Sequence, residues 1–203
     1  MTGPSEYLTI RGLTIPAIAA SIGCGLAFAG GVIDTWVPGS VFDVIKDSHA
    51  ATRELISAWA IIASQLIELV TLLVWAGVAA HNVRAMGRQP LRFSPFTTVA
   101  WFFIPFANLY MPYRAIAEAW RASEPAQSFT DAKTPWALLA WWLLSLLSII
   151  QDDSPTALGV VGVAVSLASS VLFVHLAFAL RDRQQQCAAI LSGTVAPLSG
   201  RSA

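Results

Sequence analysis

Residues 56–80 read ISAWAIIASQLIELVTLLVWAGVAA, and this stretch decides the class of fold. Its only charged residue is Glu68. A helix that crosses a bilayer needs about 20 consecutive, mostly apolar residues. The stretch meets that requirement and predicts a membrane-spanning helix with one carboxyl group near its middle.

Three further apolar and uncharged stretches, at 13–33, 135–151 and 155–180, predict three more spans. The sequence Ala27-Phe28-Ala29 in the first resembles a signal-peptide cleavage site, but we expect an uncleaved helix. The acidic pair Asp152-Asp153 separates the last two spans, so these two helices should form an antiparallel hairpin.

The composition agrees with a membrane location. The chain is 56% hydrophobic and only 12% charged, whereas soluble domains carry about 25% charged residues. The formal net charge is zero, so we expect no nucleic-acid partner. The sequence therefore predicts an all-α integral membrane fold: a single helical domain at 1–183 and a polar cytoplasmic tail at 184–203.

The segment 93–121 is apolar in its first part but is interrupted by prolines. Basic loop residues favour the cytoplasmic side of a membrane. If the segment does not cross, all of the twelve Lys and Arg residues except Lys46 and Arg53 lie on one side. If it crosses, most of them lie outside. We therefore predict four spans, a re-entrant or interfacial segment at 93–121, and both termini in the cytoplasm of a bacterial inner membrane.

Pro105 and Pro112 should each disrupt a helical turn, because proline lacks a backbone N–H. Carbonyl groups freed at membrane depth need a partner in protein or water. Asn108 lies between the two prolines, and its amide could cap them locally. Alternatively it could bind a ligand or ion, since transporters bind substrates at broken helices.

The residues after Pro112 predict a short amphipathic helix suited to the membrane surface. Tyr113 and Trp120 fall on one face, and Glu118 and Arg121 on another. We expect Glu118 to form surface ion pairs with the neighbouring arginines. Tyr113, Glu118 and Trp120 are also candidates for a ligand site.

Glu68 is the one acidic residue predicted at mid-membrane, and Gln65 lies one turn before it. A charge at the bilayer centre costs roughly 2.5–3.5 kcal/mol on insertion scales. Glu68 should therefore be either a neutral carboxyl bonded to another helix, for example to Asn108, or a group that handles protons or cations.

Other polar groups give weaker signals. His81 and His175 lie at similar predicted depths on different helices, which is a weak pattern for axial haem ligation. Cys24 and Cys187 have no disulfide or metal spacing, so both should be free thiols. We identify no catalytic motif, expect no metal site and predict no cofactor.

Small residues recur at four-residue spacing in the first and last spans, which lets membrane helices pack closely within the bundle or against a partner or second copy. They are Ala19, Gly23, Ala27, Gly31, Gly162, Ser166 and Ser170. Several tryptophans should anchor the chain at the membrane interfaces. They are Trp36, Trp59, Trp101, Trp120 and Trp136. Trp141 and Trp142 lie deeper, where they should pack in the core or against lipid.

The run WFFIPFANL at 101–109, followed by MPYR at 111–114 and WRAS at 120–123, resembles the signature of a bacterial membrane family, domain of unknown function 4328. Asn82-Val83-Arg84, the Trp141-to-Ser145 run and Arg183-Gln184 fit the same resemblance. It implies a four-helix inner-membrane protein and no particular activity.

We therefore expect a non-catalytic accessory or scaffold subunit of a membrane complex. The alternative is a small ion-coupled transporter or channel that uses Glu68 and the Pro105–Pro112 break. A haem or quinone redox protein is a remote alternative.

Overall fold

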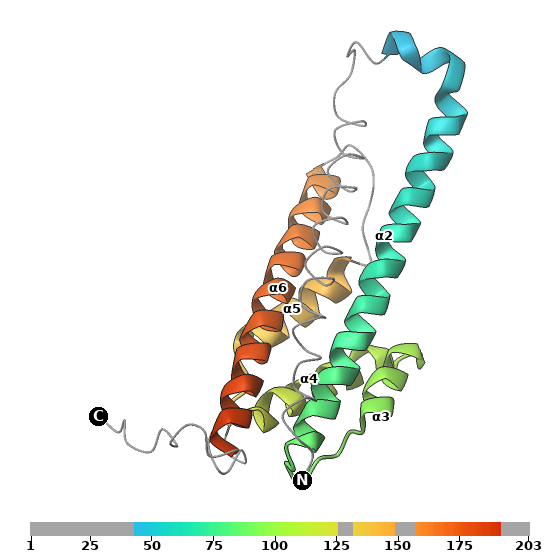
Figure 1. Cartoon of the computed structure of the whole chain (residues 1–203). Helices are drawn as coiled ribbons and strands as arrows, with labels where there is room; N and C mark the ends of the chain where they lie inside the picture. The colour runs from blue at the N-terminus through green and yellow to red at the C-terminus, as the bar shows by residue number, and fades with distance from the viewer. Residues whose placement is uncertain (1–42, 126–131, 149–156, 192–203) are drawn as a thin grey trace.

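The computed structural model describes residues 43–125, 132–148 and 157–191, and every regular element in these ranges is helical (Figure 1). The predicted span at 13–33 lies outside the described residues. The elements are α2 (Asp43–Ala85), α3 (Pro95–Ala100), the 3-10 turns η2 (Trp101–Phe103) and η3 (Ala107–Leu109), α4 (Met111–Ala122), α5 (Trp136–Leu147) and α6 (Ala157–Leu191).

Two helices are longer than the apolar stretches that predicted them. Helix α2 begins 13 residues before the predicted start at 56 and ends at Ala85, where Gly87 adopts a positive φ of 73°. Helix α6 continues past 180 to Leu191, so the first part of the predicted polar tail is helical. This continuation packs against the rest of the protein, and Gln184 and Cys187 on it are therefore buried.

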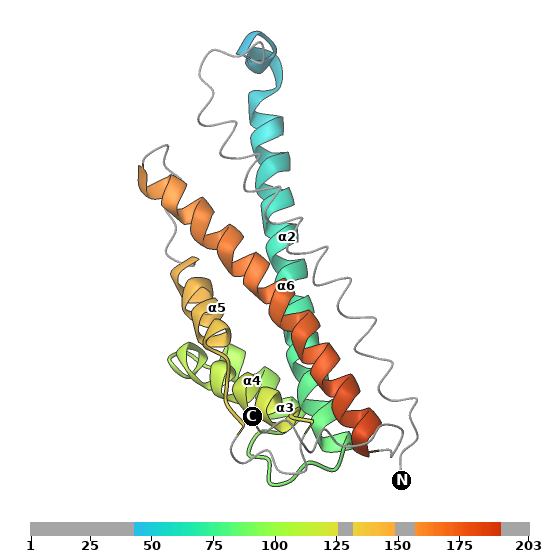
Figure 2. The same cartoon turned by 90° about the vertical axis from the view of Figure 1, so that its left-hand side faces the viewer.

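Helices α5 and α6 form an antiparallel pair (Figure 2). The ring of Trp141 stacks on Phe173 with centroids 5.5 Å apart, and four residues further along α5, Ser145 meets Ser169, four residues earlier on α6. The predicted helical hairpin is therefore observed in the packing of these two helices.

Helices α2 and α6 run parallel. Trp75 contacts Phe173 edge to face at 5.3 Å, and further along both helices Asn82 donates a hydrogen bond to Gln184. Since α5 is antiparallel to α6, it is also antiparallel to α2. The chain between α2 and α5, residues 86–135, must therefore start and finish at the same end of the bundle. We call it the returning segment.

Helices α3 and α4 of the returning segment pack against α2, and Figure 1 shows α3 beside the final turns of that helix. Helix α3 is capped by Ser94, whose side chain and backbone exchange hydrogen bonds with Thr97 in a capping box. It approaches α2 closely at Gly77, where an added Cβ would lie 3.2 Å from Val99.

The two prolines of this segment have different roles. Pro105 lies in the break between η2 and η3, next to Phe106, which has a positive φ of 62°. Pro112 instead lies in the first turn of α4, where its missing N–H costs nothing. The preceding turn η3 ends at Leu109, so the helical path is interrupted before Pro112, and this proline then lies in the first turn of a new helix.

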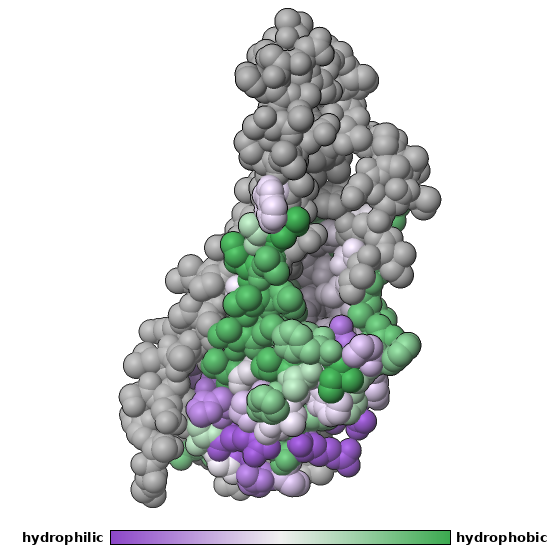
Figure 3. Space-filling view, turned by 90° about the vertical axis from the view of Figure 1, so that its right-hand side faces the viewer, coloured by the Kyte–Doolittle hydropathy of each residue, from purple (hydrophilic) through white to green (hydrophobic). Residues whose placement is uncertain are grey.

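The main core lies where α2, α4, α5 and α6 meet, around Trp75, Ile116, Leu138, Trp141 and Leu176. Large apolar side chains also cover the outside. Along α2, Ile62, Leu66, Val70 and Val74 form an exposed stripe at four-residue spacing. Figure 3 shows this apolar surface above a polar end of the molecule.

Among the described residues, one helical stretch, Ala164–Leu191, is long and apolar enough to cross a membrane. Leu69–Ala85 and Trp136–Leu147 form shorter apolar helical stretches.

Candidate functional site

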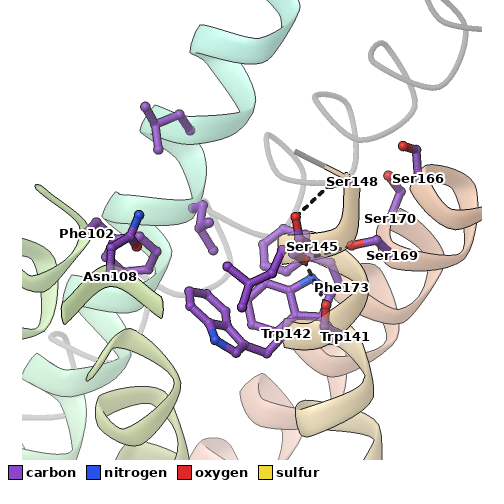
Figure 4. A pocket seen from close by; sticks show the side chains of 13 residues that line it. Phe102, Asn108, Trp141, Trp142, Ser145, Ser148, Ser166, Ser169, Ser170 and Phe173 are labelled. Atoms are coloured by element: carbon purple, nitrogen blue, oxygen red, sulfur yellow. Dashed lines mark hydrogen bonds between the residues drawn. The ribbon is translucent and has the colours of Figure 1, made fainter. Parts of the chain in front are cut away.

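A cavity of about 260 Å³ lies between α2, the returning segment and the α5–α6 pair (Figure 4). Its lining combines aromatic rings with hydroxyl and amide groups. The lining residues are Leu69, Leu72, Phe102, Asn108, Trp141, Trp142, Ser145, Leu146, Ser148, Ser166, Ser169, Ser170 and Phe173.

One wall of the cavity carries serine hydroxyls from α5 and α6. The hydroxyls of Ser145 and Ser169 lie 2.8 Å apart, and either can donate. Ser145 also bonds the Trp141 carbonyl at 2.9 Å, and Ser148 donates to the Ser145 carbonyl at 2.8 Å. Ser170 lines the same wall. The sequence placed hydroxyls on both helices, but only their antiparallel register brings them together.

Aromatic rings form the floor. Trp141 and Trp142 meet edge to face with centroids 5.8 Å apart, and Phe102 meets Trp142 in the same way at 6.1 Å. The Trp142 indole N–H donates to the Leu109 carbonyl at 2.9 Å. This bond supplies the partner that a backbone break inside apolar surroundings requires. It also fixes the orientation of the indole ring.

Asn108 lies at the opposite side of the cavity, next to Phe102 (Figure 4). Its side chain is half-buried and makes no hydrogen bond with another described residue. The expected local capping by Asn108 is therefore not what the structure has. Trp142 satisfies the carbonyl at the break, and the Asn108 amide faces the cavity.

Glu68 and Gln65 lie within helix α2, but their side chains fall outside the described residues. Their neighbours on the helix are described. Leu69 and Leu72 both line the cavity, and Leu72 lies one turn after Glu68. The structure thus brings this part of α2 and Asn108 to one cavity.

A second polar group, which we call the polar cluster, joins the ends of α2, α4 and α6. Asn82 Nδ2 donates to Gln184 Oε1 at 2.9 Å, and Gln184 Nε2 bonds the Ala79 carbonyl and the Ser123 hydroxyl, each at 3.2 Å. Ser123 in turn donates to the Ala119 carbonyl at 2.7 Å. Asn82, Ser123 and Gln184 are almost fully buried.

Charged residues complete the polar cluster. Arg88 Nη2 donates to Cys187 Sγ at 2.9 Å and to the Glu124 carbonyl. The Glu124 carboxylate forms an ion pair with Arg183, whose guanidinium lies over the Trp120 ring at 5.1 Å. These contacts bring Arg88, just after α2, and Glu124, just after α4, together at the end of α6. Cys187 is a free thiol, as predicted.

The cavity and the polar cluster both lie within the part of the chain that matches a known protein family. The model of the family described as domain of unknown function 4328 matches residues 42–194. The chain belongs to this family. No curated protein and no solved structure matches the chain. The family description assigns no activity.

Residues of the family signature occur both in the cavity and in the polar cluster. Asn82 and Gln184 bond each other, and Trp142 and Ser145 line the cavity. Their pairing across the bundle could not be read from the sequence. The available signal was a polar side chain on an otherwise apolar helix face.

Glu118 has a different role from the expected surface pairing. Its two carboxylate oxygens accept hydrogen bonds from the backbone N–H groups of Arg92 and Phe93, each at 2.9 Å. Arg121 donates instead to the Ala117 carbonyl. The fold brings the start of the returning segment beside α4, and its unpaired N–H groups use the carboxylate.

Trp120 is also placed differently from the prediction. Its side chain is only 6% exposed and belongs to the main core, because α4 packs against α2 and α5. Trp59 and Trp136 are 67% and 79% exposed, which suits an interfacial position. Tyr113 packs against the core, and Pro105 is exposed.

The remaining candidates do not converge on a site. His81 and His175 are both exposed. No group of three His, Cys, Asp or Glu side chains within the described ranges could hold a metal ion. Ser166 and Ser170 of the small-residue pattern line the cavity. Ala19, Gly23, Ala27 and Gly31 lie outside the described residues.

Proposed function

We propose that this chain is a multi-pass protein of the bacterial inner membrane, with four spans and both termini in the cytoplasm. The support is its apolar exterior. Besides the stripe of α2, exposed large apolar side chains lie on α5 and α6: Leu139, Leu143, Leu147, Leu167 and Val171. A water-soluble monomer rarely exposes apolar surface this extensive, whereas lipid solvates it.

The returning segment would then be the re-entrant one. It starts and ends at the end of the bundle that carries the polar cluster. Between these points it exposes Phe96, Phe103 and Phe106, while the Leu109 carbonyl at the break bonds to Trp142. Irregular backbone is tolerated at membrane depth only when protein or water satisfies it.

Within the membrane we propose a non-catalytic role, as an accessory or scaffold subunit of a membrane complex. The observation that carries this role is the use of the buried polar groups. Gln184 bonds both Asn82 and Ser123, and Arg88 bonds the Glu124 carbonyl at the same ends of the helices. These groups hold three helices together in a fixed arrangement, which is what a scaffold needs.

Purification of the tagged full-length chain from its native membrane in mild detergent, with mass spectrometry, tests this role. We expect a partner protein in constant ratio to the chain. As a control, a tagged unrelated membrane protein of similar abundance should not recover that partner. A monomer with no partner in constant ratio would contradict the proposal.

The cavity supports a second candidate, a small ion-coupled transporter. Asn108 and the α2 turn that contains Glu68 meet there, and helical periodicity puts position 68 on the same face as Leu72. Vesicles that contain Glu68→Gln or Asn108→Ala should then lose ion or solute flux. Flux equal to that of the unmodified chain in both variants would remove this candidate.

A further inference from the structure

The cavity has hydrogen-bonding groups on two opposite sides of an aromatic floor (Figure 4). Asn108 lies on one side, and the serines of α5 and α6, including Ser145 and Ser170, lie on the other. The ring of Trp142 lies between them. A ligand that fits this arrangement is apolar in its middle and polar at both ends.

Donors are available on both sides. The Asn108 amide makes no hydrogen bond with another described residue, and neither does the Ser170 hydroxyl. The Ser145 hydroxyl donates to the Trp141 carbonyl and also bonds the Ser169 hydroxyl, so Ser170 is the donor on this side that an occupant can use. A half-buried amide that faces a cavity gains free energy by bonding to whatever occupies it.

The size and lining favour an organic ligand over an ion. A volume of about 260 Å³ holds a ring with small substituents and far exceeds one water, whose share of liquid volume is about 30 Å³. The described lining residues carry hydroxyl, amide and aromatic groups rather than charges, and Glu68, whose side chain is not described, lies one turn before Leu72. Aromatic walls with a few polar groups are typical of sites for small uncharged molecules.

We infer that the cavity binds the ring of a lipid-soluble quinone. The ring would lie against Trp141 and Trp142. One quinone carbonyl would accept a hydrogen bond from the Asn108 amide, and the carbonyl across the ring would accept from the Ser170 hydroxyl. This inference goes beyond the proposed scaffold role and involves binding alone. It uses the proposed membrane location, because the bilayer supplies such molecules.

The test is binding of decylubiquinone, a benzoquinone with a short tail, to the purified full chain in detergent, measured by equilibrium dialysis. We expect saturable binding at one site per chain. Asn108→Leu keeps a similar volume but removes the donor, so it should weaken binding about tenfold. Ser170→Phe fills the cavity and should abolish binding. Gln186→Leu is the matched control, because Gln186 is exposed on α6, and it should leave affinity unchanged.

Two results would overturn the inference. One is the absence of saturable binding of both decylubiquinone and menadione, a naphthoquinone, to the folded chain. The other is an affinity that Asn108→Leu does not change. If thermal unfolding shows that Ser170→Phe is not folded, Asn108→Leu decides alone. The outcome is separate from that of the scaffold proposal, because binding in detergent requires no partner protein.

Discussion

The indole nitrogen of Trp142 on α5 donates a hydrogen bond to the backbone carbonyl of Leu109, 2.9 Å away at the break in the returning segment. The two residues are 33 positions apart in the chain. This bond ties the irregular segment to the helical hairpin and lets a non-helical turn lie among apolar side chains.

Removing this donor should destabilise the fold. Trp142→Phe keeps an aromatic ring on the cavity floor but leaves the Leu109 carbonyl without its partner. We expect a loss of about 1–3 kcal/mol in the free energy of unfolding, measured by denaturant titration in mild detergent. Trp136→Phe is the matched control, since Trp136 is 79% exposed, and should cost less than about 0.5 kcal/mol. Equal losses in the two variants would contradict the assigned role of the bond.

The buried pair of Asn82 and Gln184 should show strong coupling. Asn82→Leu or Gln184→Leu alone leaves a buried amide without its partner, which costs about 1–3 kcal/mol. The double variant removes both polar groups, so its loss should be clearly smaller than the sum of the single losses. A double-mutant cycle on unfolding free energies measures this difference. Additive losses would mean that the hydrogen bond between the two side chains is unimportant.

The Glu118 carboxylate should matter more than an exposed ion pair. Glu118→Ala removes the acceptor for the N–H groups of Arg92 and Phe93, and we expect a loss of about 1–3 kcal/mol in unfolding free energy. Asp182→Ala breaks the exposed pair of Asp182 with Arg181 and should cost less than about 1 kcal/mol. If Asp182→Ala proved the more damaging change, the inferred role of Glu118 would be wrong.

Cysteine labelling in intact cells tests the proposed topology. In a chain with Cys24 and Cys187 replaced by serine, Gln127→Cys should resist a membrane-impermeant thiol reagent and react only after the cells are permeabilised. Ser48→Cys, on the side predicted to face outward, should react in intact cells. Labelling of position 127 from outside would place the loop between α4 and α5 on the outer side, which requires residues 93–121 to cross the membrane and excludes the four-span arrangement.

The helical class and several details followed from sequence because they depend on local pattern. The apolar run of residues 56–80 lies within α2, and the α5–α6 hairpin follows from the short connection between two apolar runs. The ends of α6 were harder to predict. Gln184 looks like the start of a polar tail until its partners on α2 and α4 are known.

The roles of individual polar residues in the broken segment were predicted less well. Asn108 was expected to cap the break, but Trp142 supplies the bond and Asn108 faces the cavity. Glu118 was expected to pair with neighbouring arginines, but it binds backbone N–H groups from 25 and 26 residues earlier in the chain. Helical spacing identifies neighbours on one helix only, so partners brought by a turn of the chain stay hidden.

The sequence by itself determined that the described elements are helices, that large parts of their outer faces are apolar, and that residues 93–121 interrupt the regular pattern. These properties depend on composition and periodicity, which act within one or two helical turns. The sequence also predicted that this segment returns to its starting side, but the tertiary structure alone decided which faces of α2 and α6 meet, at Trp75 with Phe173 and at Asn82 with Gln184. It also decided that Trp142 satisfies the Leu109 carbonyl while Asn108 faces the cavity. The physical reason is that a buried polar group must be satisfied by whichever partner the packing brings within reach, and packing joins residues far apart in the chain.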